Sequence, residues 1–157
     1  MTTPDFILSL RKKIGHDLLW LTGITGVVLD TEDQILLVRR ADNARWSLPA
    51  GILEPGEQPA PALVREIEEE TGVEAEIVRL VSVEALPPGS YPNGDQVQFL
   101  DLCFRCRPLR GEARVNDDES IEVAWFPLTA LPAGLAPREH ACIADALKPD
   151  ELPLFAR

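Results

Sequence analysis

Residues 59–72 predict a helix whose two ends are both marked in the sequence. Pro59 and Pro61 suit its first turn, where a missing N–H costs no hydrogen bond, and Gly72 suits the position that stops it. Strand-like stretches lie before and after this helix without the regular alternation of a β-α-β protein. The chain must therefore pack this helix, and other helices, against a sheet of mixed strand direction.

Three glutamates share one face of that helix. Glu66, Glu69 and Glu70 stand at positions i, i+3 and i+4, so all three side chains project from the same side. Like charges at this spacing destabilise a helix by about 0.2–0.5 kcal/mol per pair, and the only nearby cation is Arg65. A hard divalent cation would relieve this repulsion, because Mg²⁺ prefers carboxylate oxygens. Taken alone, the glutamates also fit an ordinary solvent-exposed acidic face.

The residues around the glutamates complete a longer pattern, G-x₅-E-x₇-R-E-U-x-E-E-x-G-U, in which U is aliphatic. Its defined positions are occupied by Gly51, Glu57, Arg65, Glu66, Ile67, Glu69, Glu70, Gly72 and Val73. This segment resembles the Nudix box, and the chain is similar to small, single-domain, MutT-like members of the Nudix hydrolase superfamily. The similarity extends to three further segments: the strand before the box (34–40), its W-x-L-P approach (46–49) and a late strand (123–126).

The resemblance implies an α/β (α+β) fold, an α/β/α sandwich in which a mixed β-sheet lies between helices, formed by residues 1–157 as a single domain. Local patterns predict helices at 4–14, 59–72 and 137–147, and strands at 22–29, 34–40, 76–83, 96–107 and 120–126. The first two strands are expected to pair as a hairpin around a polar turn at 31–33.

The resemblance also implies an activity: Mg²⁺-dependent hydrolysis of a diphosphate linkage in a nucleoside diphosphate joined to another moiety. Metal ions held by carboxylates neutralise the diphosphate oxygens and lower the pKa of water. The implied ligands of Mg²⁺, or of Mn²⁺ in its place, are the Ala50 carbonyl, Glu66, Glu69 and Glu70. Arg65 would orient the carboxylates, and Glu57 would act as an outer ligand or as the partner of Arg65.

Two features of the implied site stay open. Ala50 stands where most relatives have glycine, so its carbonyl fits only if the local backbone accepts a residue with a Cβ atom. The general base is a helix glutamate, Glu66 or Glu69, or an acidic residue near the last strand. The acidic candidates are Asp118, Glu119 and Glu122.

Candidate substrate-binding residues lie outside the box. Arg39 and Arg40 end a strand that leads toward it, and strand alternation favours one of them as a phosphate contact. Trp46 and Tyr91 are candidates for stacking on a base. Asp95 offers an acceptor for ribose hydroxyls, in a Tyr91–Gln96 stretch similar to a loop of relatives described as ADP-ribose pyrophosphatases.

These residues favour a substrate of the ADP-ribose or nucleotide-sugar type. Two alternatives remain: a (d)NTP pyrophosphohydrolase of the MutT type, and a non-catalytic Nudix-fold nucleotide-binding module.

Composition narrows the partners further. A net charge of −11 without a basic cluster disfavours a nucleic acid polymer, and no stretch approaches the roughly 20 apolar residues of a membrane helix. Without a signal-like segment, we expect a cytoplasmic protein, monomeric or homodimeric, that binds a small nucleotide. Cys103 and Cys106 are expected on opposite faces of a strand rather than in a redox or zinc site, and Cys142 in the core.

Overall fold

A computed structural model describes residues 3–149 and 152–155, so residues 1, 2, 150, 151, 156 and 157 of the expected domain lie outside the described part. The helices are α1 (Asp5–Ile14), α2 (Pro59–Thr71) and α3 (Pro137–Ala146). The strands are β1 (Leu19–Val28), β2 (Gln34–Arg40), β3 (Trp46–Ser47), β4 (Ala50–Ile52), β5 (Glu74–Ala85), β6 (Gly89–Ser90), β7 (Gln96–Arg110) and β8 (Ser120–Pro127). The three helices and five longer strands confirm the predicted elements. Local patterns did not predict the short strands β3, β4 and β6.

The strands form two sheets. One has the order β4-β1-β7-β5, with β6 added on β7, and the other has the order β3-β2-β8. β1 runs parallel to β7, whereas every other ladder between named strands is antiparallel. The strand directions are therefore mixed, as predicted, but they are divided between two sheets.

The predicted hairpin between the first two strands is wrong. β1 and β2 lie in different sheets and are joined by a single bridge, Leu29 to Ile35. β1 is paired with β7 along its whole length, Leu19–Val28, and β4 takes part of its other edge. Since both edges of β1 are used, β2 pairs with β8 instead.

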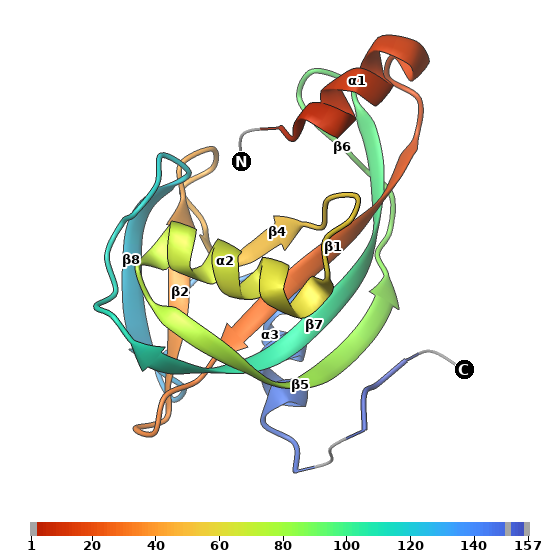
Figure 1. Ribbon diagram of the computed structural model, residues 1–157. Coiled ribbons are helices and arrows are strands. Elements are labelled where there is room, and N and C mark those ends of the chain that lie inside the picture. The colour runs from red at the N-terminus through yellow and green to blue at the C-terminus, as the bar shows by residue number, and fades with distance from the viewer. Residues whose placement is uncertain (1–2, 150–151, 156–157) are drawn as a thin grey trace.

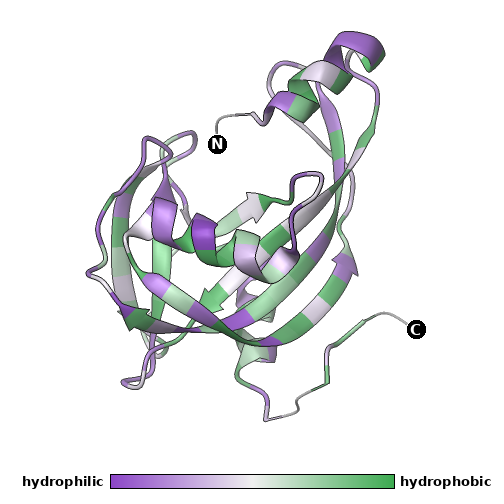
Figure 2. Cartoon of the chain, viewed as in Figure 1, coloured by the Kyte–Doolittle hydropathy of each residue, from purple (hydrophilic) through white to green (hydrophobic). Residues whose placement is uncertain are grey.

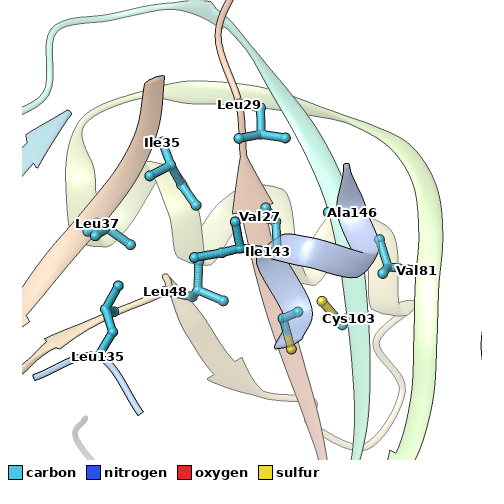
Figure 3. Packing of buried hydrophobic residues seen from close by; sticks show 11 residues of the cluster. Val27, Leu29, Ile35, Leu37, Leu48, Val81, Cys103, Leu135, Ile143 and Ala146 are labelled. Atoms are coloured by element: carbon cyan, nitrogen blue, oxygen red, sulfur yellow. The ribbon is translucent and has the colours of Figure 1, made fainter. Parts of the chain in front are cut away.

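Helices cover the two faces of the larger sheet (Figure 1). α2 lies on one face, where Leu63 and Ile67 pack with Ile24 of β1. α3 lies on the opposite face, and Figure 3 shows its Ile143 beside Val27 of β1. Neighbouring residues of a strand point to opposite faces, so β1 contributes to both cores. This layering confirms the α/β/α arrangement.

The cysteines lie as predicted. Cys103 faces the core beneath α3, where Cys142 is also buried, whereas Cys106 faces the core beneath α2. Burial raises the pKa of the Cys106 thiol to about 12. Because the thiol form is therefore favoured at neutral pH, Cys106 is a weak nucleophile.

Hydrophilic residues predominate in the loops, whereas the strands include hydrophobic stretches (Figure 2). In the described residues, no helix has the length and apolar character that crossing a membrane requires.

Candidate functional site

Arg65 gathers three carboxylates beside α2. Its guanidinium donates to Glu69 at 2.9 Å and to Glu57 at 3.1 Å, and it lies 3.0 Å from Glu66. Glu57 also accepts a hydrogen bond from the Glu54 N–H, which fixes the loop before the helix. The contacts expected of Arg65 and Glu57 are thus present. Their part in catalysis stays a prediction.

Gly51 gives Glu66 the room to reach the site. A Cβ atom on Gly51 would lie 2.6 Å from the Glu66 Cγ and 2.7 Å from its Cδ, closer than real contacts allow. Burial raises the pKa of Glu66, which Arg65 opposes and Glu69 reinforces. The box glycine is thus required by the close approach of α2 to β4.

We expect Gly51→Ala to lower kcat by about tenfold while the protein remains folded, because the new methyl group displaces the Glu66 carboxylate. Gly89→Ala is the matched control, since a Cβ atom there meets nothing within 4 Å. Steady-state kinetics with thermal melts of both variants measure the effect. Equal kcat values for the two variants would contradict this role for Gly51.

Glu70 forms the centre of a second acidic cluster. One carboxylate oxygen each from Glu70, Asp117 and Glu119 lie within 4.8 Å of one another. Glu70 is only 8% exposed, and burial, followed by the charges of Asp117 and Glu66, raises its pKa to about 8. Without a cation, Glu70 therefore holds a proton at neutral pH.

The loop after β7 brings Asp117 to this cluster. The Arg114 N–H donates to the Thr71 carbonyl, and the Asn116 side chain donates to the Glu68 carbonyl, so the loop caps the end of α2. Asp117 accepts hydrogen bonds from the N–H groups of residues 119 and 120 through one oxygen. Asp117 was not among the residues predicted from the sequence, which included only its acidic neighbours Asp118, Glu119 and Glu122. A run of acidic residues before a strand does not show which of them points inward.

The residues present fit a divalent cation. The Glu70 Oε2 atom is buried without a hydrogen-bond partner, although two other carboxylates lie close by. An unpartnered buried oxygen beside like charges is unfavourable unless a cation is bound. Clustered carboxylate oxygens are the donors that Mg²⁺ prefers. The cluster of Glu70, Asp117 and Glu119 would hold the ion, and the roles of Glu66 and Glu69 as ligands stay predictions.

The backbone at Ala50 accepts alanine. Its φ is not among the positive values found in the described residues, so the Cβ atom causes no strain. The N–H of Ala50 hydrogen-bonds the Glu70 carboxylate, which lowers the pKa of Glu70 slightly against the effect of burial. The open question about alanine is answered, and the role of its carbonyl as a ligand stays a prediction.

Two cavities meet at Glu119. The larger, of about 1150 Å³, is lined by Glu70, Asp118 and Glu119 together with the predicted residues Arg40, Ala50, Tyr91 and Asp95. The smaller, of about 200 Å³, is lined by Arg65, Glu66, Glu69 and Glu119. Glu70 in the larger cavity and Glu66 and Glu69 in the smaller one therefore lie in the same region of the structure.

Arg40 lines the larger cavity, near both Glu70 of the acidic cluster and Tyr91. Arg40 lies two residues after Val38, which lines the same cavity, so strand alternation places both on one face of β2 and Arg39 on the other. Arg40 also donates two hydrogen bonds, of 2.9 and 2.7 Å, to Asp42. The pKa of Arg40 is raised first by Asp42, and also by the charges of Glu70 and Tyr91. The Arg40 guanidinium is thus close enough to interact electrostatically with both Glu70 and Tyr91.

Three predicted site residues lie elsewhere, because none of them lines either cavity in the described part of the chain. Arg39 and Glu122 face each other across the β2–β8 ladder, 3.3 Å apart. Trp46 packs edge-on against Phe126, with ring centroids 4.7 Å apart. With these partners, Arg39, Glu122 and Trp46 gain no support from the two cavities, and their expected roles in binding phosphate, in accepting a proton and in stacking stay predictions.

A buried ion pair on the cavity wall was also missed by the sequence analysis. Asp101 of β7 is 5% exposed and accepts hydrogen bonds from the Thr25 hydroxyl, at 2.9 Å, and from Arg138 of α3. All three residues line the larger cavity. The available signal was an aspartate within an otherwise apolar strand, Leu100–Leu102.

Comparisons with known proteins agree with this geometry. The model of the NUDIX domain family matches residues 20–147. The chain is 36% identical to a human protein, 8-oxo-dGDP phosphatase NUDT18, over 84% of this chain and 38% of that protein. It is 33% identical to the putative ADP-ribose pyrophosphatase YjhB of Bacillus subtilis, over 79% of this chain and 61% of that protein. The chain therefore spans less than two thirds of each of these relatives.

A solved structure is similar as well. The MutT NUDIX hydrolase from Burkholderia pseudomallei superimposes with a TM-score of 0.68 at 26% identity, over 81% of this chain and 98% of that one. The family match includes the box segment, residues 51–73, and the strands on either side of it. The chain belongs to the NUDIX domain family.

Proposed function

We propose that this protein hydrolyses a diphosphate linkage in a nucleoside diphosphate joined to another moiety, with a divalent cation as cofactor. The observation that carries the proposal is the cluster of Glu70, Asp117 and Glu119, of which Glu70 and Glu119 line a cavity of about 1150 Å³. Its buried, unpartnered carboxylate oxygen suits a cation, and the cavity suits a nucleotide. Residues 1–157 would act as a single domain, as a monomer or a homodimer.

The chain's own residues would share the work. Glu70, Asp117 and Glu119 would hold Mg²⁺, which when bound supplies charge neutralisation and lowers the pKa of a nearby water. Arg65 would orient Glu66 and Glu69 through contacts of 2.9–3.0 Å. Glu66, Glu69, Asp118 and Glu119 line the two cavities and are the favoured candidates for accepting the proton of the attacking water.

Arg40 is the candidate for a phosphate contact. Its guanidinium is near Glu70 and already holds Asp42 with two hydrogen bonds, which leaves one edge of the fork for an anionic oxygen. The remainder of the substrate would lie beyond Arg40, beside Tyr91, which is 48% exposed and lines the same cavity. The order of Glu70, Arg40 and Tyr91 along the cavity supports a substrate with a second moiety beyond the diphosphate.

ADP-ribose or a nucleotide sugar is the favoured substrate type. The wall of the cavity beside Tyr91 offers an aromatic ring and the polar groups of the 91–96 loop, and the guanidinium of Arg11 in that wall is already occupied by three backbone carbonyls and by Asp95. Such a wall suits sugar hydroxyls better than a terminal phosphate. The B. subtilis relative named as a putative ADP-ribose pyrophosphatase supports this choice.

The second candidate is a (d)NTP or (d)NDP phosphohydrolase of the MutT type. The relative named 8-oxo-dGDP phosphatase favours it, and so does the buried Asp101–Arg138 pair, which offers an acceptor and donors to a polar base edge. A non-catalytic binding module is disfavoured, because every defined position of the box is occupied.

Product identity separates these candidates. With Mg²⁺, we expect ADP-ribose to give AMP and a sugar phosphate, with a kcat/KM at least about tenfold above that for dGTP or dGDP. Nucleotide sugars, dinucleoside polyphosphates and NADH complete the panel, with products resolved by chromatography. A preference for dGTP or dGDP would replace the favoured substrate with the second candidate. Hydrolysis of no member of the panel would refute the proposed function.

A further inference from the structure

We propose that Arg11 of α1 is a positioning residue that holds Tyr91 at the wall of the substrate cavity. It would do so by fixing the 91–96 loop, so that Tyr91 contacts the part of the substrate beyond the diphosphate. The inference rests on the proposed function for its substrate class, a nucleoside diphosphate with a second sugar.

Arg11 is bound more fully than a surface arginine requires. Its guanidinium donates to the carbonyls of Gly15 at 3.1 Å, Asp17 at 2.7 Å and Gln96 at 2.7 Å. The side chain is 13% exposed and lies 3.6 Å from the Asp95 carboxylate. Gly15 and Asp17 follow α1, whereas Gln96 begins β7. One side chain therefore joins the end of the helix to the start of a strand 85 residues away.

Asp95 is engaged on both oxygens. One accepts from His16 at 2.7 Å, and the other accepts from the Asn93 amide at 2.9 Å. The N–H of Gln96 also donates to the His16 carbonyl, at 3.1 Å. A carboxylate that is occupied in this way is poorly placed to accept from ribose hydroxyls, so Asp95 acts on the loop rather than on the substrate.

The anchored loop carries Tyr91 into the cavity. The Tyr91 N–H donates to the Asp95 carbonyl and the Gly94 N–H donates to the Tyr91 carbonyl, both at 2.9 Å, so the turn closes on itself. Ile7 and Arg11 of α1 line the same cavity as Tyr91. In Figure 1, α1 stands beside β6 and the start of β7. Helix and loop thus form one wall.

The role of α1 follows from what holds it in place. Ile7 is its only buried residue, and Pro4 provides no side-chain cap for its first turn. Ile7 packs with Leu21, Ile52 and Val97, and the partly buried Phe6 packs against the same cluster, so apolar contacts hold the first turn of α1. The contacts of Arg11 join its last turn to the 91–96 loop. A loop that is ordered before binding loses less entropy when the substrate arrives. Arg11 therefore affects affinity more than the chemical step.

A double-mutant cycle tests this inference. Arg11→Met, Tyr91→Ala and the double variant are compared, with Lys12→Met as the control that removes an exposed charge from the same helix. We expect each single variant to raise KM for ADP-ribose by about tenfold with kcat within about twofold. In the Tyr91→Ala background, Arg11→Met should raise KM no further. Lys12→Met should leave both constants unchanged.

Two further measurements keep the test decisive. Asp95→Asn replaces Arg11→Met in a second cycle, in case loss of the guanidinium unfolds α1, and thermal melts follow each variant. Calorimetry of ADP-ribose with Ca²⁺ measures Kd independently of turnover. Additive effects on KM and Kd, or an unchanged KM in Arg11→Met, would overturn the inference. Wild-type protein that binds ADP-ribose but hydrolyses no member of the panel would refute the proposed function alone. Wild-type protein that does not bind ADP-ribose would refute this inference, whichever other nucleotide it hydrolyses.

Discussion

Chelation of divalent cations should abolish hydrolysis, and added Mg²⁺ or Mn²⁺ should restore it. Carboxylates form the acidic cluster, and an anionic diphosphate cannot approach Glu70, Asp117 and Glu119 unless a cation reverses the local charge. The loss in kcat should reach about three orders of magnitude or more, because charge neutralisation and water activation both depend on the ion. Turnover of ADP-ribose in EDTA, followed by titration with Mg²⁺, measures the effect.

Ca²⁺ provides the control for this prediction. It binds carboxylate oxygens at longer distances and with looser geometry than Mg²⁺, so it should support binding but little turnover. Turnover in EDTA equal to that in Mg²⁺ would refute a metal-dependent mechanism. Restoration by any monovalent salt would show that general screening, and not a site at Glu70, relieves the repulsion.

The helix of the box was predictable because its signals are local. Pro59 at the start and Gly72 at the end mark residues whose backbone requirements are independent of the rest of the fold, and the structure places α2 between them with Gly72 at a φ of 71°. The spacing of Glu66 and Glu70 then follows from helical geometry alone. The same reasoning placed Cys103 and Cys106 on opposite faces of β7.

Pairing between strands was less predictable. Residues 22–29 and 34–40 have the composition of a hairpin, but β1 has stronger partners in β7 and β4 that lie far away in the sequence. A pattern of apolar residues shows that a strand is buried and does not show which edge is free. The division into two sheets is therefore a property of the tertiary structure.

Long-range contacts also decide which residues line the larger cavity. Strand alternation separates Arg40 from Arg39, but only the packing around β2 shows that the face with Arg40 lines the cavity. Asp117 reaches Glu70 because its loop caps the end of α2. Trp46, a strong candidate by residue type, finds Phe126 as a packing partner instead. Residue type alone identifies groups able to bind a nucleotide, but only packing decides which of them line the cavity.

Glu70→Gln should lower kcat by about 100-fold or more, because an amide keeps the volume of the side chain but removes the charge that holds the cation. Glu68→Gln is the matched control. Glu68 is an exposed glutamate on the same helix and lines neither cavity in the described residues, so its substitution should leave kcat unchanged. Steady-state kinetics at saturating Mg²⁺ compare the two variants. A near wild-type kcat for Glu70→Gln would remove Glu70 from the metal site.

The Glu70→Gln substitution should also make the stability of the metal-free protein less dependent on pH. The pKa of Glu70 is raised by burial from 4.5 to about 8 in the folded state, so the folded protein binds more protons than the unfolded chain between these values. The contribution of Glu70 to stability is therefore full below pH 4.5 and is lost as the pH rises through 8. In EDTA, we expect the Tm of wild-type protein to fall across this range more steeply than that of Glu70→Gln. Identical pH profiles of the two proteins, measured by calorimetry, would show that the buried carboxylate does not carry this proton.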